Sequence, residues 1–130
     1  MNITSTSPWQ WQDHLGFSQA VETKNTQRML YCSGQAAMDA DGRTLGGDMS
    51  YQIVQTLKNI ETVIAKAGYN PEGIVRLNFY TTSIPDFFEA YDIVKIWMKQ
   101  YGIAPSSTLL EVSALAFPGL SVEIEATVAG

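Results

Sequence analysis

The sequence predicts an α+β domain in which one mixed sheet is covered on one face by two helices. Apolar residues recur with a helical period in two segments and with a period of two in two others. These segments alternate along the chain as strands, helix, strand, helix and strands, an order that favours one sheet with helices on one face. With 130 residues, of which 45% are hydrophobic, residues 1–130 have the size of one domain and can bury a core without disulfides or metal.

The first half of the chain predicts a short strand, a turn and a long helix. Residues 1–14 are polar and aromatic, and this N-terminal segment is expected to lie over the surface or to begin an edge strand. Residues 29–33 predict a strand, and residues 39–42 have the composition of a turn. A helix is predicted to follow Asp48 as N-cap and to end at Gly68. Its apolar positions at helical spacing are Ile53, Val54, Leu57, Ile60, Val63, Ile64 and Ala67.

The second half predicts a strand, a second helix and two closing strands. Residues 75–80 alternate between apolar and polar side chains, which is typical of a half-buried strand. The second helix is expected to start near Ser83 and to stop at Gly102. The closing strands are predicted at residues 107–113 and 120–128. The apolar stripe of the second helix consists of Phe87, Tyr91, Val94, Trp97, Met98 and Tyr101.

The sheet face away from the helices is predicted to be polar with interspersed apolar residues. A charge buried on this face would need a partner, and Arg76 is the predicted partner of a nearby carboxylate. The face is therefore expected to be either solvated or covered by another subunit. Its predicted members are Arg76, Asn78, Tyr80, Leu109, Glu111, Glu123 and Glu125.

Composition disfavours several classes of partner and cofactor. The net charge is −5 and the basic residues form no stripe, whereas nucleic-acid binding depends on clustered phosphate contacts, so nucleic acid is an unlikely partner. No apolar run is long enough to cross a membrane. His14 is the only histidine, the carboxylates lack metal-ligand spacing, and no glycine-rich phosphate loop is present. The sequence therefore predicts no metal and no cofactor.

The single cysteine and the N-terminal residues predict a cytoplasmic protein. Cys32 excludes an intramolecular disulfide, fits a reducing compartment and is expected to be a packed thiol. Residues 1–16 have neither the basic region nor the apolar run of a signal peptide.

Several segments, taken together in order and spacing, resemble the Rid/YjgF family of enamine/imine deaminases. The resemblance covers about residues 15–130 and implies a chorismate-mutase-like α+β fold. It also implies a homotrimer whose sheets join in a central barrel, with small-molecule metabolites bound in clefts between subunits. The segments that carry it are Gly16–Ala20, Tyr31–Gln35, Ile64–Gly68 and, following Pro105, Val122–Ala126.

The resemblance also implies which residues form the site. Glu123 matches the family's carboxylate, which positions the water that attacks the imine carbon and shuttles its proton. Ser107 stands where the family's Pro-x-Arg-Ser segment has the arginine that clamps the substrate carboxylate, and Phe17 stands where the family has a tyrosine. The other substrate-binding positions implied by the resemblance are Ser33, Gly34, Thr108 and Leu109.

The missing arginine leaves three hypotheses for function. A serine hydroxyl offers one neutral donor where a guanidinium offers a charged, bidentate fork, so standard 2-aminoacrylate deaminase activity is predicted to be weak or absent. The first hypothesis is binding or hydrolysis of a small imine, enamine or related metabolite that is neutral or held differently. The second is a non-catalytic metabolite-binding or protein-interaction trimer. The third, an endoribonuclease, is disfavoured because the chain has no histidine pair and no basic groove.

The residues by themselves also allow structural interpretations of the same positions. Glu123 is compatible with a charge-paired residue of the sheet face. Residues 33–34 are compatible with the simple end of a strand, and residues 107–108 with its ordinary start. Trp9 and Trp11 are predicted either to pack against the domain or to rim a cleft.

Overall fold

The computed structural model describes residues 1–130 and confirms the α+β class. Strands β3, β6, β4 and β5, in this order, form a mixed sheet in which only the β4–β5 pair is parallel. The elements in chain order are β1 (Asn2–Thr6), η1 (Asp13–Leu15), β2 (Ala20–Lys24), β3 (Met29–Tyr31), α1 (Met49–Lys66), η2 (Pro71–Gly73), β4 (Ile74–Thr81), α2 (Ile84–Glu89), α3 (Tyr91–Gln100), β5 (Ser106–Glu111) and β6 (Val122–Ala129).

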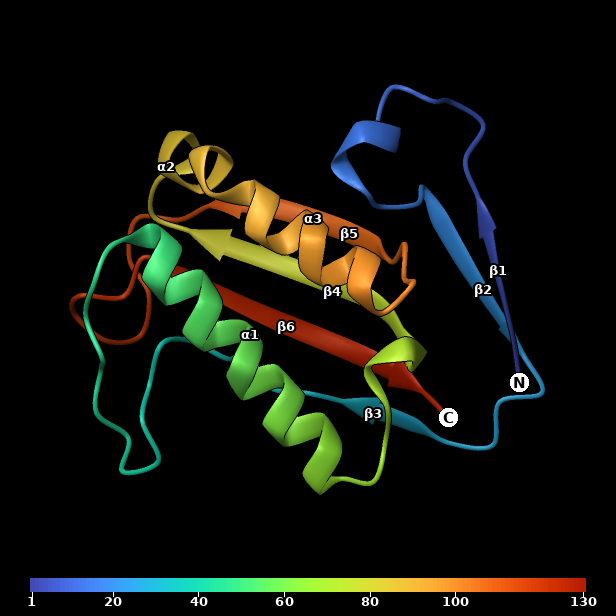
Figure 1. The fold of residues 1–130 in the computed structure, drawn as a ribbon, viewed down its shortest axis with the longest axis horizontal. Helices are drawn as coiled ribbons and strands as arrows, with labels where there is room; N and C mark the ends of the chain where they lie inside the picture. The colour runs from blue at the N-terminus through green and yellow to red at the C-terminus, as the bar shows by residue number, and fades with distance from the viewer.

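Helices α1 and α3 contact each other and cover the same face of the four-stranded sheet (Figure 1). The apolar stripes of the helices and the inward side chains of β4 and β6 form one buried cluster, as the two-layer prediction requires. No helix of the structure has the length and apolarity needed to cross a membrane. Representative core residues are Ile53, Ile60, Phe87 and Val94 from the helices and Leu77, Phe79, Val122 and Ile124 from the strands.

Both predicted ends of α1 are confirmed by their hydrogen bonds. The Asp48 carboxylate accepts a hydrogen bond from the backbone N–H of Tyr51 at 2.9 Å, which satisfies one of the free donors of the first turn. At the other end, Gly68 adopts a φ of 79°, and the Tyr69 N–H donates to the Ile64 carbonyl. This is a Schellman motif, in which glycine accommodates the left-handed backbone conformation at low cost.

The second predicted helix is divided into α2 and α3. Ser83 caps α2 as expected, because its hydroxyl accepts from the Asp86 N–H at 3.3 Å. Ala90, with φ of −102° and ψ of 3°, departs from helical geometry and separates the two helices. The predicted apolar stripe nevertheless stays on the core side of both segments, and the predicted stop at Gly102 is confirmed.

The predicted orientation of two β5 residues was wrong. Leu109 lies opposite the core residue Phe79 and packs against the core. Glu111 accepts a hydrogen bond from the Ile84 N–H at the start of α2, so both side chains lie on the helix side of the sheet. Leu110, opposite Tyr80, points instead to the sheet face away from the helices, which we call the open face. The two consecutive leucines remove the alternation from which the orientation would otherwise be read.

The N-terminal residues form a hairpin that the sequence predicted only in part. Strand β1 pairs with β2 in antiparallel register, from Asn2 opposite Lys24 to Thr6 opposite Ala20. An edge strand near the N-terminus was an expected alternative, whereas no strand was predicted at Ala20–Lys24. Figure 1 shows the hairpin set apart from the four-stranded sheet, in agreement with its largely exposed side chains.

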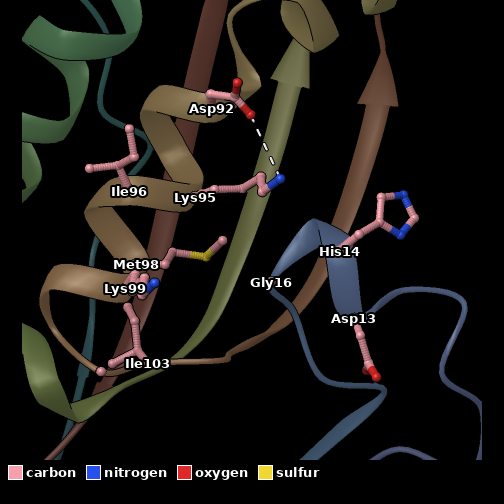
Figure 2. A pocket seen from close by; sticks show the side chains of 10 residues that line it. Asp13, His14, Gly16, Asp92, Lys95, Ile96, Met98, Lys99 and Ile103 are labelled. Carbon is pink, nitrogen blue, oxygen red and sulfur yellow. Dashed lines mark ion pairs between the residues drawn. The ribbon is translucent and has the colours of Figure 1, made fainter.

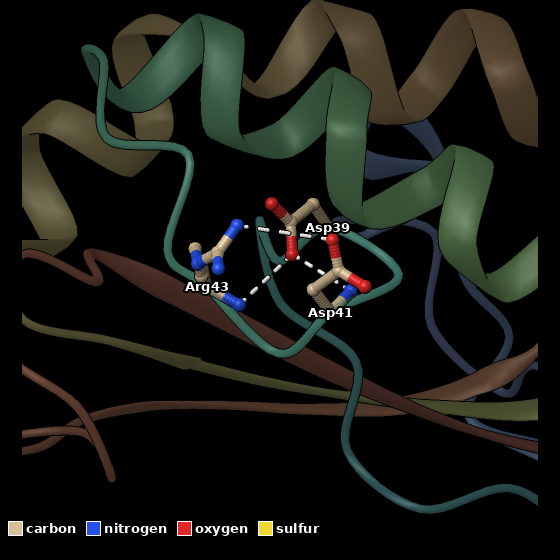
Figure 3. Close-up of polar contacts among 3 residues, drawn as sticks. All are labelled: Asp39, Asp41 and Arg43. Atoms are coloured by element: carbon tan, nitrogen blue, oxygen red, sulfur yellow. Dashed lines mark hydrogen bonds and ion pairs between the residues drawn. The ribbon is translucent and has the colours of Figure 1, made fainter.

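The predicted turn after β3 is built on one carboxylate. Asp39 Oδ1 accepts hydrogen bonds from the backbone N–H groups of Asp41 and Arg43, each at 2.9 Å (Figure 3). The Arg43 guanidinium also lies 3.8 Å from the Asp41 carboxylate, an exposed pair of little energetic weight. The Asn59 side chain donates to the Ala36 carbonyl at 2.8 Å and so holds the segment between β3 and the turn against α1.

Candidate functional site

Three predicted site residues, Phe17, Ser107 and Leu109, line one pocket of about 180 Å³ on the helix side of the sheet. Ser107 and Leu109 reach it because they lie opposite Leu77 and Phe79, both core residues, and directly paired residues point to the same face. Ser107 is the one lining residue that is neither aliphatic nor aromatic. We call this the aromatic pocket; its full lining is Trp11, Leu15, Phe17, Phe79, Phe87, Phe88, Tyr91, Ser107 and Leu109.

Two hydrogen bonds place Phe17 beside the start of β5. The Ser18 N–H donates to the Pro105 carbonyl at 2.9 Å, and the Tyr91 hydroxyl donates to the Leu15 carbonyl at 2.5 Å. Burial raises the pKa of Tyr91 to about 12, so this phenol is a neutral donor at physiological pH. The loop that carries Phe17 is therefore attached to both α3 and the sheet.

Two exposed aromatic side chains of the aromatic pocket extend the predicted site. Trp11 is 61% exposed and Phe88 is 47% exposed, yet both line the pocket. Of the two alternatives given for the N-terminal tryptophans, Trp11 agrees with the one in which it lines a cleft. Trp9, 57% exposed, does not line the pocket. Phe88 was not among the predicted site residues because it lies outside the apolar stripe of the helix. Its position next to Phe87 in the sequence was the one signal that could have indicated it.

Glu123 and Gly34 lie on the other side of the sheet, in a second pocket of about 350 Å³. Glu123 faces this side because it lies opposite Tyr80 and alternates with buried neighbours along β6. Within the chain its carboxylate neither accepts a hydrogen bond nor pairs with a cation, and it is therefore free to bind a ligand or water. We call this the acidic pocket; it is lined by Gly34, Tyr80, Val112, Ala114, Leu115, Ala116, Glu123 and Glu125.

Gly34 allows the close approach of Glu123. A Cβ atom on Gly34 would lie 2.7 Å from both Cδ and Oε1 of Glu123, well inside van der Waals contact. The glycine therefore leaves the space that the carboxylate occupies. Ser33 is exposed and lines neither pocket, and its carbonyl accepts from the Gln35 side chain at 3.1 Å.

The second carboxylate of the acidic pocket is engaged by its neighbours. Glu125 Oε1 accepts hydrogen bonds from the Tyr80 hydroxyl at 2.6 Å and from the Asn78 amide at 2.9 Å. The bond from Tyr80, then that from Asn78, and the charge of Arg76 lower the pKa of Glu125, although burial opposes them. The same bond raises the pKa of Tyr80. Glu125 is thus a fixed anion, whereas Glu123 is unengaged.

Arg76 does not pair with a carboxylate, contrary to the prediction. Its guanidinium donates to the hydroxyls of Thr108 at 2.8 Å and Ser106 at 3.3 Å. Thr108 therefore lies on the open face, opposite to the face of Ser107, and its hydroxyl oxygen already accepts a hydrogen bond from Arg76. Neither the aromatic pocket nor the acidic pocket is lined by a lysine or arginine.

A third hollow, of about 610 Å³, lies between η1 and α3 and contains none of the predicted site residues. Figure 2 shows Asp13 and His14 on one side of it and the Asp92–Lys95 ion pair, 3.7 Å long, on the other. Exposed charges of both signs are mixed in this hollow, so its electrostatics favour no single type of ligand.

Fold and site together define a small α+β protein with an unengaged carboxylate on the open sheet face and an apolar pocket on the helix face. The family model described as Endoribonuclease L-PSP matches residues 12–130. The chain belongs to this family, the Rid/YjgF family.

Individual relatives agree with this assignment. A RutC family protein from Aquifex aeolicus is 30% identical over 109 residues, covering 84% of each chain. The 2-iminobutanoate/2-iminopropanoate deaminase of Homo sapiens is 32% identical over 111 residues, covering 85% of this chain and 77% of the relative. Among solved structures, the Rid-family protein YyfB from Yersinia pestis, described as of unknown function, is 33% identical and covers 100% of both chains with a TM-score of 0.86.

Proposed function

We propose that the protein hydrolyses a small imine or enamine that carries no carboxylate, in clefts formed between subunits. The observation that carries this proposal is the charge distribution of the two pockets. The family resemblance implies an arginine at the position of Ser107. Neither pocket is lined by a cation, and the acidic pocket holds Glu123 and Glu125. A substrate carboxylate would meet repulsion from Glu123 and Glu125 and would find no lining cation to pair with. The deaminase named among the relatives supports the C=N chemistry.

In the proposed reaction, a water oxygen attacks the imine carbon while Glu123 accepts the proton that the water loses. The resulting carbinolamine takes up a proton on nitrogen, the C–N bond breaks, and ammonia leaves as the C=O bond forms. One water is consumed and one carbonyl compound and one ammonia are produced. Glu123 suits this role because its carboxylate has no other partner within the chain.

The proposed assembly is a homotrimer, supported by the placement of the candidate residues. Within one chain, Ser107 and Glu123 point to opposite faces of the sheet, so one cleft can contain both only if two subunits contribute. A closed trimer also covers the open face. Light scattering at micromolar concentration is expected to give three times the chain mass of 14.3 kDa. A single-chain mass under these conditions would contradict the assembly and the shared cleft.

The proposed substrate preference is tested by ammonia release from imines generated in situ. An amine oxidase supplies imines without a carboxylate, and an amino-acid oxidase supplies imines that retain one. We expect the protein to accelerate hydrolysis of the first class and to have weak or no activity on the second, including 2-aminoacrylate. Equal acceleration of both classes would show that the missing arginine does not set the preference. Binding without acceleration of either class would favour the non-catalytic alternative.

RNA cleavage, which the family's descriptive name suggests, is not part of the proposal. The chain carries a net charge of −5, and the acidic pocket would repel phosphates.

Replacing Gly34 by alanine is expected to slow imine hydrolysis by about 10- to 100-fold, because misplacement of a reacting group by about 1 Å has effects of this size. The new methyl group would lie 2.7 Å from the Glu123 carboxylate and displace it. Stability should change little, since Gly34 does not have a positive φ and the displaced group is the flexible end of a side chain. Steady-state rates and thermal unfolding of both proteins check this. An unchanged rate would place Glu123 outside the chemistry.

A further inference from the structure

We infer that the aromatic pocket binds a phenyl-sized apolar ring of the ligand. This inference rests on the proposed function and adds the substrate class: imines or enamines that carry a ring and no carboxylate. Four observations support it, namely the volume of the pocket, the arrangement of its aromatic rings, the exposure of its mouth and its shortage of polar groups.

The volume suits one ring. The pocket measures about 180 Å³, and a cavity of roughly 150 Å³ lined by apolar side chains is large enough to bind benzene. A two- or three-carbon side chain would leave much of this apolar space unfilled and would gain little from it. A fused two-ring group would have to extend past the mouth toward Trp11.

The wall holds aromatic rings in tilted and edge-to-face arrangements. The centroids of Phe79 and Phe87 are 5.5 Å apart, and Phe88 lies 5.9 Å from Tyr91 in an edge-to-face arrangement. Aromatic rings prefer tilted and edge-to-face neighbours at such distances, so a bound ring would extend an existing cluster. Phe17, at a position where the family resemblance implies a tyrosine, keeps this wall apolar.

The mouth of the pocket is formed by two large apolar side chains that face solvent. Trp11 packs its ring edge-to-face on Phe17 with centroids 6.2 Å apart, and Phe88 packs on Phe87 at 6.3 Å. Both side chains line the pocket and are exposed, and exposed apolar surface at a pocket is characteristic of binding sites. A ring seated between them would bury apolar area on both sides.

The pocket offers very little to a polar ligand. The Tyr91 hydroxyl already donates to the Leu15 carbonyl, which leaves the Ser107 hydroxyl and the Trp11 indole N–H as the remaining side-chain donors. A carboxylate entering this space would lose its hydration without gaining a cation. An apolar ring with at most one neutral polar substituent therefore fits the lining best.

The binding test uses acetophenone and 2-butanone, two ketones of the product class that differ by a ring. We expect acetophenone to bind the wild-type protein at least about tenfold more tightly in calorimetric titration, as aromatic contacts and added apolar burial predict. Trp11→Ala and Phe88→Ala should each reduce that preference several-fold. Trp9→Ala is the matched control, because Trp9 is comparably exposed and does not line the pocket. Thermal unfolding and light scattering verify that each variant is folded and assembled.

The turnover test compares imines produced by an amine oxidase from 2-phenylethylamine and from butylamine. A higher kcat/KM for the ring-bearing imine, reduced by Trp11→Ala but not by Trp9→Ala, supports the inference. Equal binding of the two ketones, or equal losses in the two tryptophan variants, would overturn it. Efficient hydrolysis of both imines without preference would overturn the ring site and leave the proposed function standing. Selective acetophenone binding without any hydrolysis would support the ring site and overturn the proposed function.

Discussion

Glu123→Gln is expected to lower the rate of imine hydrolysis by about 10²- to 10⁴-fold, the usual contribution of a positioned general base. The amide keeps the shape of the side chain and cannot accept a proton from water. The Michaelis constant should change much less than kcat, because the carboxylate acts on the water. Stability should also change little, since the Glu123 side chain has no hydrogen-bond partner to lose within the chain. Ammonia release and thermal unfolding give the two readouts.

Glu125→Gln is the informative comparison, because Glu125 lies two residues away on the same strand face. Its carboxylate accepts from Tyr80 and Asn78, and weakening these hydrogen bonds is expected to lower stability by about 1 kcal/mol. Its effect on kcat should be much smaller than that of Glu123→Gln. Equal losses of activity in the two variants would show that the pocket needs negative charge in general, and not a base at Glu123.

Ser107→Arg is expected to raise the affinity for 2-oxo acids by about tenfold or more, since hydrogen bonds to charged groups contribute about 1.5–3 kcal/mol each. The same change should weaken acetophenone binding, because the guanidinium would lie among the rings of the aromatic pocket and fill it. The predicted result is therefore an exchange of selectivity. Calorimetric titration of a 2-oxo acid and of acetophenone against wild type and variant measures both parts.

Phe17→Tyr completes this series because the family resemblance implies a tyrosine at this position. A greater-than-additive gain in the double variant with Ser107→Arg would reveal a dormant carboxylate site of the family type. Thr62→Arg, which adds the same charge on the exposed side of α1, controls for net charge. The gain is limited by placement, since a grafted arginine without supporting contacts lies up to about 1 Å from its best position. A folded, trimeric double variant that binds no 2-oxo acid would show that the cleft serves a different ligand.

Some features of the molecule follow from local sequence. Helix α1 begins after Asp48 and ends before Gly68 because a capping carboxylate and a left-handed glycine act within a few residues of chain. The orientation of β6 was readable as well, because its side chains alternate strictly between apolar and polar. The family assignment likewise rested on short segments in a fixed order, and the family model confirmed it over residues 12–130.

Tertiary structure decided to which face of the sheet each candidate site residue points. The family resemblance implied that Ser107, Leu109 and Glu123 line clefts between subunits. Within one chain, the register of β5 against β4 turns Ser107 and Leu109 toward the helices, while the pairing of β6 with β4 turns Glu123 away from them. Register joins strands that are distant in sequence, and a shift of one residue reverses the face of every side chain. The backbone contact of Ser18 with Pro105 likewise brings Trp11 and Phe17 to the start of β5. No local pattern encodes such contacts, because they depend on where the folded chain packs the N-terminal loop.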